Sequence, residues 1–327
     1  MKKLLILSIL FVSILNKSFS QTNFKVIGEI AHPDNVYYLS VASKLTSLEL
    51  KNNKFQIELK KGEFPKGLSI ATISKGKIKY LTPTIWIDTD SVNIYFDFKN
   101  EKSSFNIDHR YIDQDISEKI EKANNKEKLD LIKENIKTYP AMFFLYEHIK
   151  RISLSELESM YSMISEKNKS SLIVQRINDY IKAKKISVPR KGDQFISFNL
   201  ESKSETATQI DQLSDKRRLL AFVSTGCGYS LASLSELSKL YTIYGEDVDF
   251  ITIWDDNEKD TWQNAKAELK SVIEWTDLWD KTKFAANYFD IPMHPSFYLI
   301  DENGYILAFI KGYNPKKMRK MLAKNLE

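Results

Sequence analysis

The fold of the second half of the chain is indicated by one stretch, 219-LLAFVSTGCGYS-230. Leu219 to Val223 form a continuous apolar run, as a strand buried on both faces requires. A turn that contains Cys227 follows, and residues 231–244 then carry a helical pattern. The stretch therefore predicts a buried strand that leads through a cysteine-bearing turn into a helix.

The alternation of strands and helices continues toward the C-terminus. Short apolar runs predict strands, and longer stretches with apolar residues at helical spacing predict helices. The predicted strands are 219–223, 248–254, 296–300 and 306–310, and the predicted helices are 231–244, 261–273 and 315–326. This order indicates an α/β domain over residues 187–327, with a sheet that is covered on both faces.

Residues 21–105 show a different pattern, that of a β-rich module. Phe55 to Leu59 alternate between apolar and polar side chains, as a strand with one buried face does. Turn signals recur at positions such as Gly62 and Gly76, too close together for long helices. We expect a small antiparallel β module here, and it contains no recognisable catalytic motif.

Residues 106–186 are expected to form a helical segment. Glycine is absent between residues 108 and 186, and the single proline of that stretch, Pro140, suits the first turn of a helix. Apolar residues follow at helical spacing, beginning with Met142 and Leu145. The predicted fold class is therefore multidomain: an N-terminal antiparallel β module, a helical middle segment and a C-terminal α/β domain.

The first twenty residues have the three zones of a secretory signal peptide. Two lysines at the start are followed by an apolar run from Leu4 to Leu15, and the small residues Ser18 and Ser20 flank Phe19. This pattern predicts cleavage after Ser20 and an exported protein, with the periplasm as the expected compartment. The apolar run is shorter than the roughly 20 residues that span a bilayer, so no membrane span is expected after cleavage.

The composition is that of a soluble, globular chain of several domains. Of the 327 residues, 43% are hydrophobic and 28% are charged. The formal net charge is +5, but the predicted signal peptide holds three lysines and no acid, which leaves +2. A nearly neutral chain offers no electrostatic argument for binding nucleic acid.

Cys227 is the single cysteine of the chain, which excludes a disulfide framework and a cysteine-rich metal site. Its predicted place at the start of a helix favours the thiolate, because free backbone N–H groups and the helix dipole stabilise negative charge. A lone cysteine is equally well explained as a small buried apolar residue. Position alone leaves both alternatives open.

A second stretch, 290-DIPMHPSFYLIDENG-304, places Pro295 at the entry to a strand and Gly304 in the turn after it. With both stretches in view, residues 187–327 resemble the thioredoxin superfamily, and more closely its exported TlpA/ResA-like thiol–disulfide oxidoreductases. Residues 219–230 are similar to that family's strand and C-x-x-C turn, and Pro295 is similar to its cis-proline. The order of a β module, a helical segment and this domain resembles longer members of the group.

The resemblance implies a two-cysteine reaction that this chain cannot complete. In the family, the first cysteine attacks a substrate disulfide, and the second, three residues later, resolves the mixed disulfide. Ser230 occupies the second position here, and a hydroxyl cannot form a disulfide. We expect Ser230 to donate a hydrogen bond to the Cys227 sulfur, a role compatible with helix capping. Gly226 and Ala221 also depart from the family, which usually has tryptophan and, in many thioredoxins, a buried acid there.

The other predicted site residues lie in the proline loop. The resemblance implies that Pro295 helps to dock an extended peptide beside the cysteine. His294 is expected to face the sulfur, where a protonated imidazole would stabilise the thiolate, and the alternative is an ordinary loop histidine. The expected partners are proteins or small thiols that form a mixed disulfide with Cys227, or proteins that dock on this loop.

Three functions remain open at this point. The first is a monothiol oxidoreductase whose mixed disulfide is resolved by an outside thiol. The second is a non-catalytic binding module with a degenerate site. The third, and least favoured, is a one-cysteine peroxidase, because Ser224 resembles the threonine of the peroxiredoxin Thr-x-x-Cys pattern while the proline of that pattern is missing. No cofactor is expected, and Asp255 to Glu258 are better explained as a helix cap than as a metal site.

Overall fold

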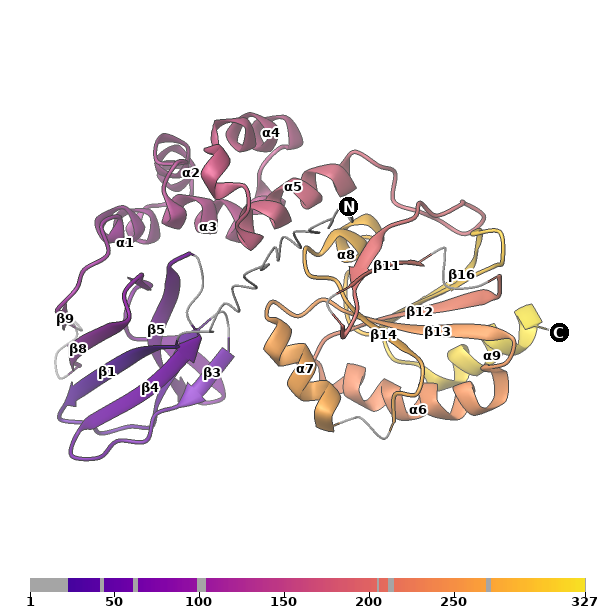
Figure 1. The fold of residues 1–327 in the computed structure, drawn as a ribbon, viewed down its shortest axis with the longest axis horizontal. Helices are drawn as coiled ribbons and strands as arrows, with labels where there is room; N and C mark the ends of the chain where they lie inside the picture. Colours follow the sequence, from indigo (N-terminus) through magenta and orange to yellow (C-terminus); the bar gives the residue numbers. More distant parts are fainter. Residues whose placement is uncertain are drawn as a thin grey trace, which may run out of the picture.

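The computed structural model describes residues 23–41, 44–60, 64–98, 104–204, 206–210, 215–268 and 272–326. The predicted signal peptide and its cleavage after Ser20 lie outside these residues. Within them the order of regions is strands, then helices, then a mixed α/β region (Figure 1). The multidomain fold class is therefore confirmed. Among the described helices, none has the length and apolar character needed to cross a bilayer.

Two sheets form the N-terminal region. The first has the order β4-β1-β8-β9, and the second has the order β3-β2-β5-β6 with β7 paired to β5. The strands are β1 (Asn23–Ala31), β2 (Tyr37–Val41), β3 (Lys44–Ser47), β4 (Lys54–Lys60), β5 (Lys66–Ser74), β6 (Lys77–Tyr80), β7 (Ile85–Ile87), β8 (Ser91–Asp97) and β9 (Ser104–Ile107). Alternate side chains of both sheets meet in one apolar core that includes Val26, Ile70 and Phe96.

One strand pair corrects the expectation of a purely antiparallel module. The strands β1 and β8 run parallel, with Lys25 opposite Ser91, whereas the other pairs described in this region are antiparallel. The chain between β1 and β8 builds the second sheet before it returns, and such a long connection allows a parallel pair. Alternating side chains could not reveal this, because the alternation is the same for both strand directions.

The middle of the chain is helical, as expected. Its helices are α1 (Gln114–Lys122), α2 (Asn125–Glu134), α3 (Tyr139–Glu147), α4 (Leu154–Met163) and α5 (Leu172–Lys184). Pro140 lies in the first turn of α3, and the Ser153 hydroxyl caps α4 by accepting a hydrogen bond from the Glu156 N–H. Met142, Leu157 and other buried apolar residues form a separate core for this segment.

The C-terminal region contains a sheet with the order β11-β10-β14-β13-β12-β15-β16. Its strands are β10 (Asn199–Glu201), β11 (Ala207–Gln209), β12 (Arg217–Val223), β13 (Val248–Trp254), β14 (Thr276–Trp279), β15 (Ser296–Ile300) and β16 (Ile306–Lys311). The central strands β12, β13 and β14 are parallel, and β15 and β16 continue the sheet antiparallel. The carboxyl ends of β12 and β13 therefore lie side by side at one edge.

Helices cover both faces of this sheet (Figure 1). They are α6 (Gly228–Tyr244), α7 (Lys259–Glu268), α8 (Phe284–Tyr288) and α9 (Pro315–Leu326). Leu219 and Ala221 of β12 share a core with α6, α7 and α9, whereas Leu220 and Phe222 share a core with α8. Because alternate residues of β12 are buried on opposite faces, the strand needs the continuous apolar run that its sequence shows.

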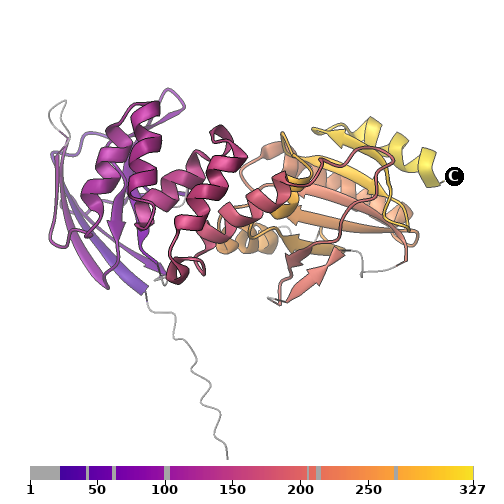
Figure 2. The same cartoon turned by 90° about the horizontal axis from the view of Figure 1, so that it is seen from above.

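The helical segment lies between the other two regions (Figure 2). Polar contacts tie it and the β module to the α/β region near the end of β13. The Arg176 guanidinium of α5 donates to the backbone oxygens of Asn257 and Lys281 at 2.6 and 3.0 Å. Lys60 of β4 forms an ion pair with Asp260 at 2.8 Å. Residues 257–260 are thus in contact with both preceding regions.

Candidate functional site

Cys227 lies at the N-terminal end of α6, directly after the turn that follows β12. Its N–H donates to the Ser224 oxygen at 3.1 Å, and its own carbonyl accepts from the Leu231 N–H at 3.2 Å. The side chain is partly exposed and is not part of the apolar cores. This placement does not fit the alternative of a small buried apolar residue, and it leaves the sulfur accessible.

Two sets of hydrogen-bonding groups surround the Cys227 sulfur, and they favour opposite protonation states. The thiol donates to the backbone oxygen of His294 at 3.2 Å, a contact that only the protonated form can make. Burial also raises the pKa of Cys227, but hydrogen bonds from Ser230 and from the Tyr229 N–H outweigh it. The net result is a pKa below the ordinary cysteine value.

Ser230 occupies the third position of α6 and is fully buried. Both its backbone N–H and its hydroxyl contribute to the lowered pKa of Cys227. Its oxygen also accepts a hydrogen bond from the Ser224 N–H at 3.2 Å. Ser230 therefore ties the first turn of the helix to the turn before it, and it directs polar groups at the sulfur.

The turn before Cys227 is held by Asp256, a residue that the sequence did not assign to the site. The Thr225 N–H and hydroxyl donate to its carboxylate at 3.1 and 2.7 Å, and the Ser224 hydroxyl donates at 3.3 Å. Burial raises the pKa of Asp256, although the Thr225 hydrogen bonds oppose the rise. The position of Asp256 after the predicted strand 248–254 could have indicated it, because residues that follow adjacent parallel strands meet at the same edge of the sheet.

The peptide bond between His294 and Pro295 is cis. Pro295 is buried, and its carbonyl accepts from the Gly312 N–H at 2.9 Å. The loop thus lies against Cys227 through the His294 carbonyl described above. Its role in docking a peptide stays a prediction.

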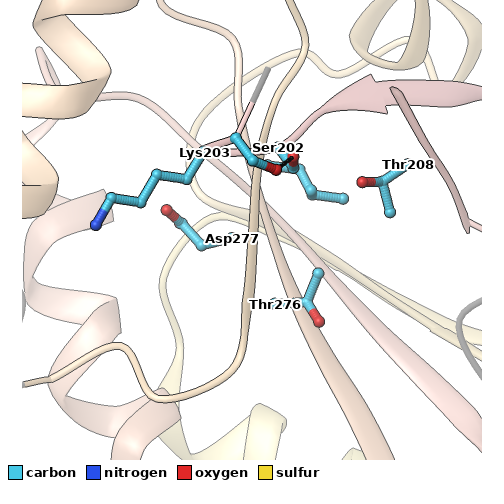
Figure 3. A pocket seen from close by; sticks show the side chains of 7 residues that line it. Ser202, Lys203, Thr208, Thr276 and Asp277 are labelled. Atoms are coloured by element: carbon cyan, nitrogen blue, oxygen red, sulfur yellow. Dashed lines mark hydrogen bonds between the residues drawn. The ribbon is translucent and has the colours of Figure 1, made fainter. Parts of the chain in front are cut away.

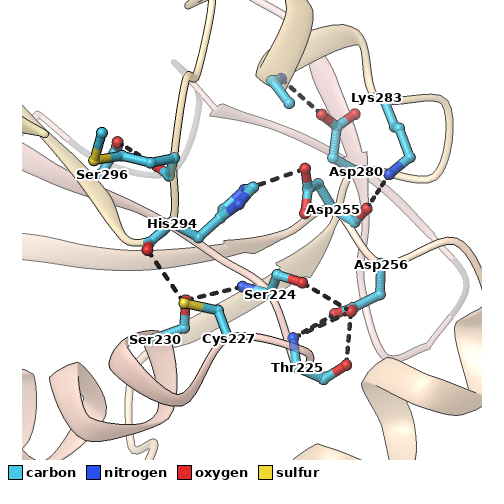
Figure 4. A network of polar contacts seen from close by, with 12 residues as sticks. Ser224, Thr225, Cys227, Ser230, Asp255, Asp256, Asp280, Lys283, His294 and Ser296 are labelled. Atoms are coloured by element: carbon cyan, nitrogen blue, oxygen red, sulfur yellow. Dashed lines mark hydrogen bonds and ion pairs between the residues drawn. The ribbon is translucent and has the colours of Figure 1, made fainter. Parts of the chain in front are cut away.

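The His294 ring lies differently from what the sequence suggested. It points away from the sulfur and toward Asp255, with Nε2 3.2 Å from the carboxylate oxygen Oδ2 (Figure 4). This is an ion-pair contact when the ring is protonated, and the buried Nε2 makes no hydrogen bond within the described residues. The buried carboxylate at the end of β13 attracts the ring, so the carbonyl rather than the imidazole faces Cys227.

Further titratable groups lie behind Asp255 (Figure 4). The Lys283 ammonium donates to the Asp255 backbone oxygen, and burial lowers the pKa of Lys283. Asp280 is 1% exposed and accepts from the Ala286 N–H at 2.9 Å. Burial raises the pKa of Asp280 to about 7. The cluster is internal and does not open onto the sulfur.

Exposed apolar side chains flank the cysteine on the solvent side. Tyr229 is 70% exposed and Met293 is 52% exposed, and Leu231 is also exposed at the start of α6. Tyr229 and Leu231 come from the helix, whereas Met293 comes from the proline loop. Exposed apolar side chains therefore belong to both elements that meet at Cys227, the start of α6 and the proline loop.

A separate hollow lies beside the short β10–β11 hairpin and β14 (Figure 3). It contains none of the predicted site residues, and its lining is Ser202, Lys203, Ser204, Thr208, Thr276, Asp277 and Leu278. In the part of the chain that the structure describes, no three or more His, Cys, Asp or Glu side chains are grouped as metal ligands would be.

One family model and several solved structures are similar to this region. The model of a thioredoxin-like domain matches residues 205–326. A thiol:disulfide interchange protein from a Bacteroides species is 18% identical with a TM-score of 0.38, and the match covers 42% of this chain and 91% of that one. The thioredoxin domain of a thiol-disulfide oxidoreductase from Bacteroides vulgatus is 19% identical with a TM-score of 0.36, covering 40% and 96%.

A secreted disulfide oxidoreductase from Mycobacterium tuberculosis is 18% identical with a TM-score of 0.35, and the match covers 39% of this chain and 95% of that one. A search among curated protein sequences gave no match. The C-terminal part of the chain is thus a thioredoxin-like domain, and the whole chain holds one cysteine.

Proposed function

We propose that this protein carries out thiol–disulfide exchange through Cys227 alone, with an outside thiol in place of the missing second cysteine. One observation carries the proposal: Cys227 is accessible, and its surroundings lower its pKa. A lowered pKa raises the fraction of thiolate, the form that attacks a disulfide. A cysteine that served only packing would need neither property.

The proposed reaction has two exchange steps. The Cys227 thiolate attacks one sulfur of a partner disulfide, so that a mixed disulfide forms and the other partner sulfur leaves as a thiolate that takes up a proton. An outside thiolate then attacks the partner sulfur of the mixed disulfide. This step frees the Cys227 thiolate and leaves the partner joined to the outside thiol, with no net change in the number of disulfides.

The residues around Cys227 have distinct roles in this proposal. Ser230 and the Tyr229 N–H stabilise the thiolate before attack and after release. The exposed side chains of Tyr229 and Met293 offer apolar contact to a protein partner, and the loop at Pro295 offers backbone groups. A small thiol needs only the sulfur, so it is the simpler candidate for the resolving step.

The second candidate function is a binding module in which Cys227 takes no part. The exposed apolar pair favours it, because Tyr229 and Met293 could hold a partner without any covalent bond. The two candidates differ in what removal of the sulfur does. Partner binding that is unchanged in Cys227→Ser supports the binding module and contradicts the exchange proposal.

The direct test measures how fast iodoacetamide alkylates the mature protein, residues 21–327, across pH 5 to 10. We expect the rate to rise at a lower pH than for a free cysteine, since the pKa is lowered. Cys227→Ser is the control for background labelling. Titration at or above the ordinary cysteine value, or no labelling of the folded protein, would overturn the proposal.

Two further assays separate the reaction classes. Incubation with a disulfide such as oxidised glutathione should give a protein–glutathione mixed disulfide and one released glutathione, and reduced glutathione should then remove the adduct. Consumption of hydrogen peroxide should be slow. Ser224 would have to take the place of the peroxiredoxin threonine, but its hydroxyl donates to Asp256 rather than to a group at the sulfur. Rapid peroxide turnover would instead support the peroxidase.

We also propose that the protein works after export, as the first twenty residues suggest. Fractionation followed by intact mass measurement tests this directly. The expected result is a periplasmic species that begins at Gln21, and an uncleaved species in the cytoplasm would contradict it.

A further inference from the structure

The contact between Asp255 and His294 joins two elements that are far apart in the sequence. Asp255 follows β13, and His294 precedes β15, on opposite sides of β12 in the sheet. The ring of His294 is held at the Asp255 carboxylate, 3.2 Å away, while its carbonyl lies 3.2 Å from the Cys227 sulfur (Figure 4). One residue therefore contacts the carboxylate with its side chain and the thiol with its backbone.

Asp255 itself is held firmly in place. Its backbone N–H donates to the Val223 oxygen at 3.3 Å, and its backbone oxygen accepts from Lys283. Its side chain is only 15% exposed. Burial raises the pKa of Asp255, but His294 and the charge of Lys283 outweigh it, so the carboxyl is ionised. Several other charged or titratable groups lie near Asp255. They are His294 of the proline loop, Lys283 before α8, Asp256 and Asp280 after β13 and β14, and Tyr146 and Arg176 of the helical segment.

We propose that Asp255 is a positioning residue for Cys227: by holding the His294 ring, it keeps the His294 carbonyl against the thiol. Asp255 does not touch the sulfur, and it acts only through the loop. The part that this positioning plays in the cell rests on the proposed exchange reaction. The geometry of the contact itself is independent of that reaction.

The consequence for the thiol has a definite sign. A carbonyl oxygen accepts a hydrogen bond from the S–H group and has nothing to donate to a thiolate, so this contact favours the protonated form. Ser230 and the Tyr229 N–H favour the thiolate. If the carbonyl moves away, only the second set remains, and Cys227 should titrate at a lower pH.

This sign separates positioning from two other roles. If the His294 ring acted as a nearby positive charge, its loss would make Cys227 titrate at a higher pH. If the variant simply loosened the fold, Cys227 would lose its contacts with Ser230 and also titrate higher, near the ordinary value. Of these three roles for His294, removal of the carbonyl contact is the one that moves the titration downward.

The experiment compares His294→Ala with His294→Gln in the mature protein. Alanine cannot reach Asp255, whereas the glutamine amide can still donate to its carboxylate without carrying a charge. For His294→Ala we expect the midpoint of alkylation against pH to fall by about 0.5, close to a threefold change in thiolate fraction below the midpoint. His294→Gln should restore the midpoint toward that of the unmodified sequence.

Asp255→Ala and Asp255→Asn provide a second, matched pair. Both variants lose the same negative charge, so the difference between them reports the contact with the ring. We expect the alanine variant to shift the midpoint further downward than the asparagine variant, whose amide oxygen can still accept from the ring. Thermal unfolding of each variant reports whether the fold is retained. If Asp255→Ala does not fold, the His294 pair alone decides.

An upward shift or no shift in His294→Ala overturns the positioning role. An equal shift in His294→Ala and His294→Gln also overturns it. The exchange proposal can fail on its own. If the midpoints move as expected but the unmodified protein forms no adduct with oxidised glutathione, the exchange reaction is wrong. Asp255 would still position the thiol in that case. If adducts form and the midpoints do not move, the exchange reaction stands without the positioning role.

Discussion

Replacing the buried acid Asp280 by asparagine should make the protein less sensitive to rising pH. Asp280 is 1% exposed, and burial raises its pKa from an ordinary 3.8 to about 7. The nearby charge of Asp255 adds to the rise, and Lys283 opposes it. Asparagine keeps the oxygen that accepts from the Ala286 N–H, so the fold loses no hydrogen bond at this position.

The direction of this pH effect follows from which state, folded or unfolded, holds the Asp280 proton more tightly. The folded state binds the Asp280 proton up to about pH 7, whereas the unfolded state releases it near its ordinary pKa. Stability is therefore greatest below the ordinary value and falls as the pH rises toward 7. The gap between the two pKa values corresponds to about 4 kcal/mol in full, of which about 3 kcal/mol falls between pH 5 and pH 8.

The assay is urea unfolding at a series of pH values, followed by tryptophan fluorescence. Four of the five tryptophans lie in the thioredoxin-like domain, so the signal reports mainly on the region that contains Asp280. The useful quantity is the difference in unfolding free energy between Asp280→Asn and the unmodified protein, because other titrating groups cancel in it. We expect this difference to grow by about 3 kcal/mol in favour of the variant from pH 5 to pH 8.

The exposed acid Asp247 supplies the matched control. Asp247→Asn should follow the unmodified protein within about 0.5 kcal/mol at every pH. Parallel curves for Asp280→Asn and the unmodified protein across this range would refute the reasoning, since they would mean that Asp280 releases its proton at the same pH in both states.

Three other substitutions test further contacts. Ser230→Ala should raise the pKa of Cys227, because it removes the hydroxyl that helps to lower that pKa while it keeps the backbone N–H, and alkylation at pH 7 should slow about threefold. Glu236→Gln should lower the free energy of unfolding by about 1–2 kcal/mol at pH 7, since Glu236 binds Arg319 through both oxygens at 2.6 and 3.1 Å. Because Arg319 lowers the pKa of Glu236, the unmodified protein should lose this advantage as the pH falls below the ordinary glutamate value. Urea unfolding at pH 7 and at pH 3 checks both points. Gly28→Ala should destabilise the β module by about 2 kcal/mol, because its new Cβ would lie 2.1 Å from a buried aromatic ring on β4, and thermal unfolding followed by circular dichroism checks the loss.

Much of the thioredoxin-like domain could be predicted because its central strands are buried on both faces. The predicted bounds of β13 and β15 match the structure, since a continuous apolar run between turns leaves little choice. The strand β12 begins two residues earlier than predicted, at Arg217, and α6 begins three residues earlier, at Gly228. Helix ends are harder to place because their first turn need not be apolar.

The elements that the sequence did not reveal are the short ones. The strands β10 and β11 have three residues each, and β14 has four, so alternation has no room to show. Helix α8 has five residues, little more than one turn, and shows no helical period.

The candidate site divides along a similar line. Cys227, Ser230 and Pro295 could be chosen because each has a fixed place in a local motif. Asp255 and Asp256 have no such motif, and their roles depend on which strand ends meet across the sheet, so only their position after a predicted strand could indicate them. The orientation of His294 was also out of reach, since the sequence cannot say whether the ring or the carbonyl of a residue faces a neighbour.

The side chain of Arg176 has a consequence for how this protein can be taken apart. By sequence it belongs to the helical segment, yet it supplies two hydrogen bonds to carbonyls of the thioredoxin-like domain, at Asn257 and Lys281. A fragment that begins at residue 187 would keep Cys227 but lose Arg176. Both carbonyls would then be left to water, and one of them, that of Asn257, is only two residues from Asp255. A fragment meant for redox measurements should therefore include α5, so that both hydrogen bonds from Arg176 are kept.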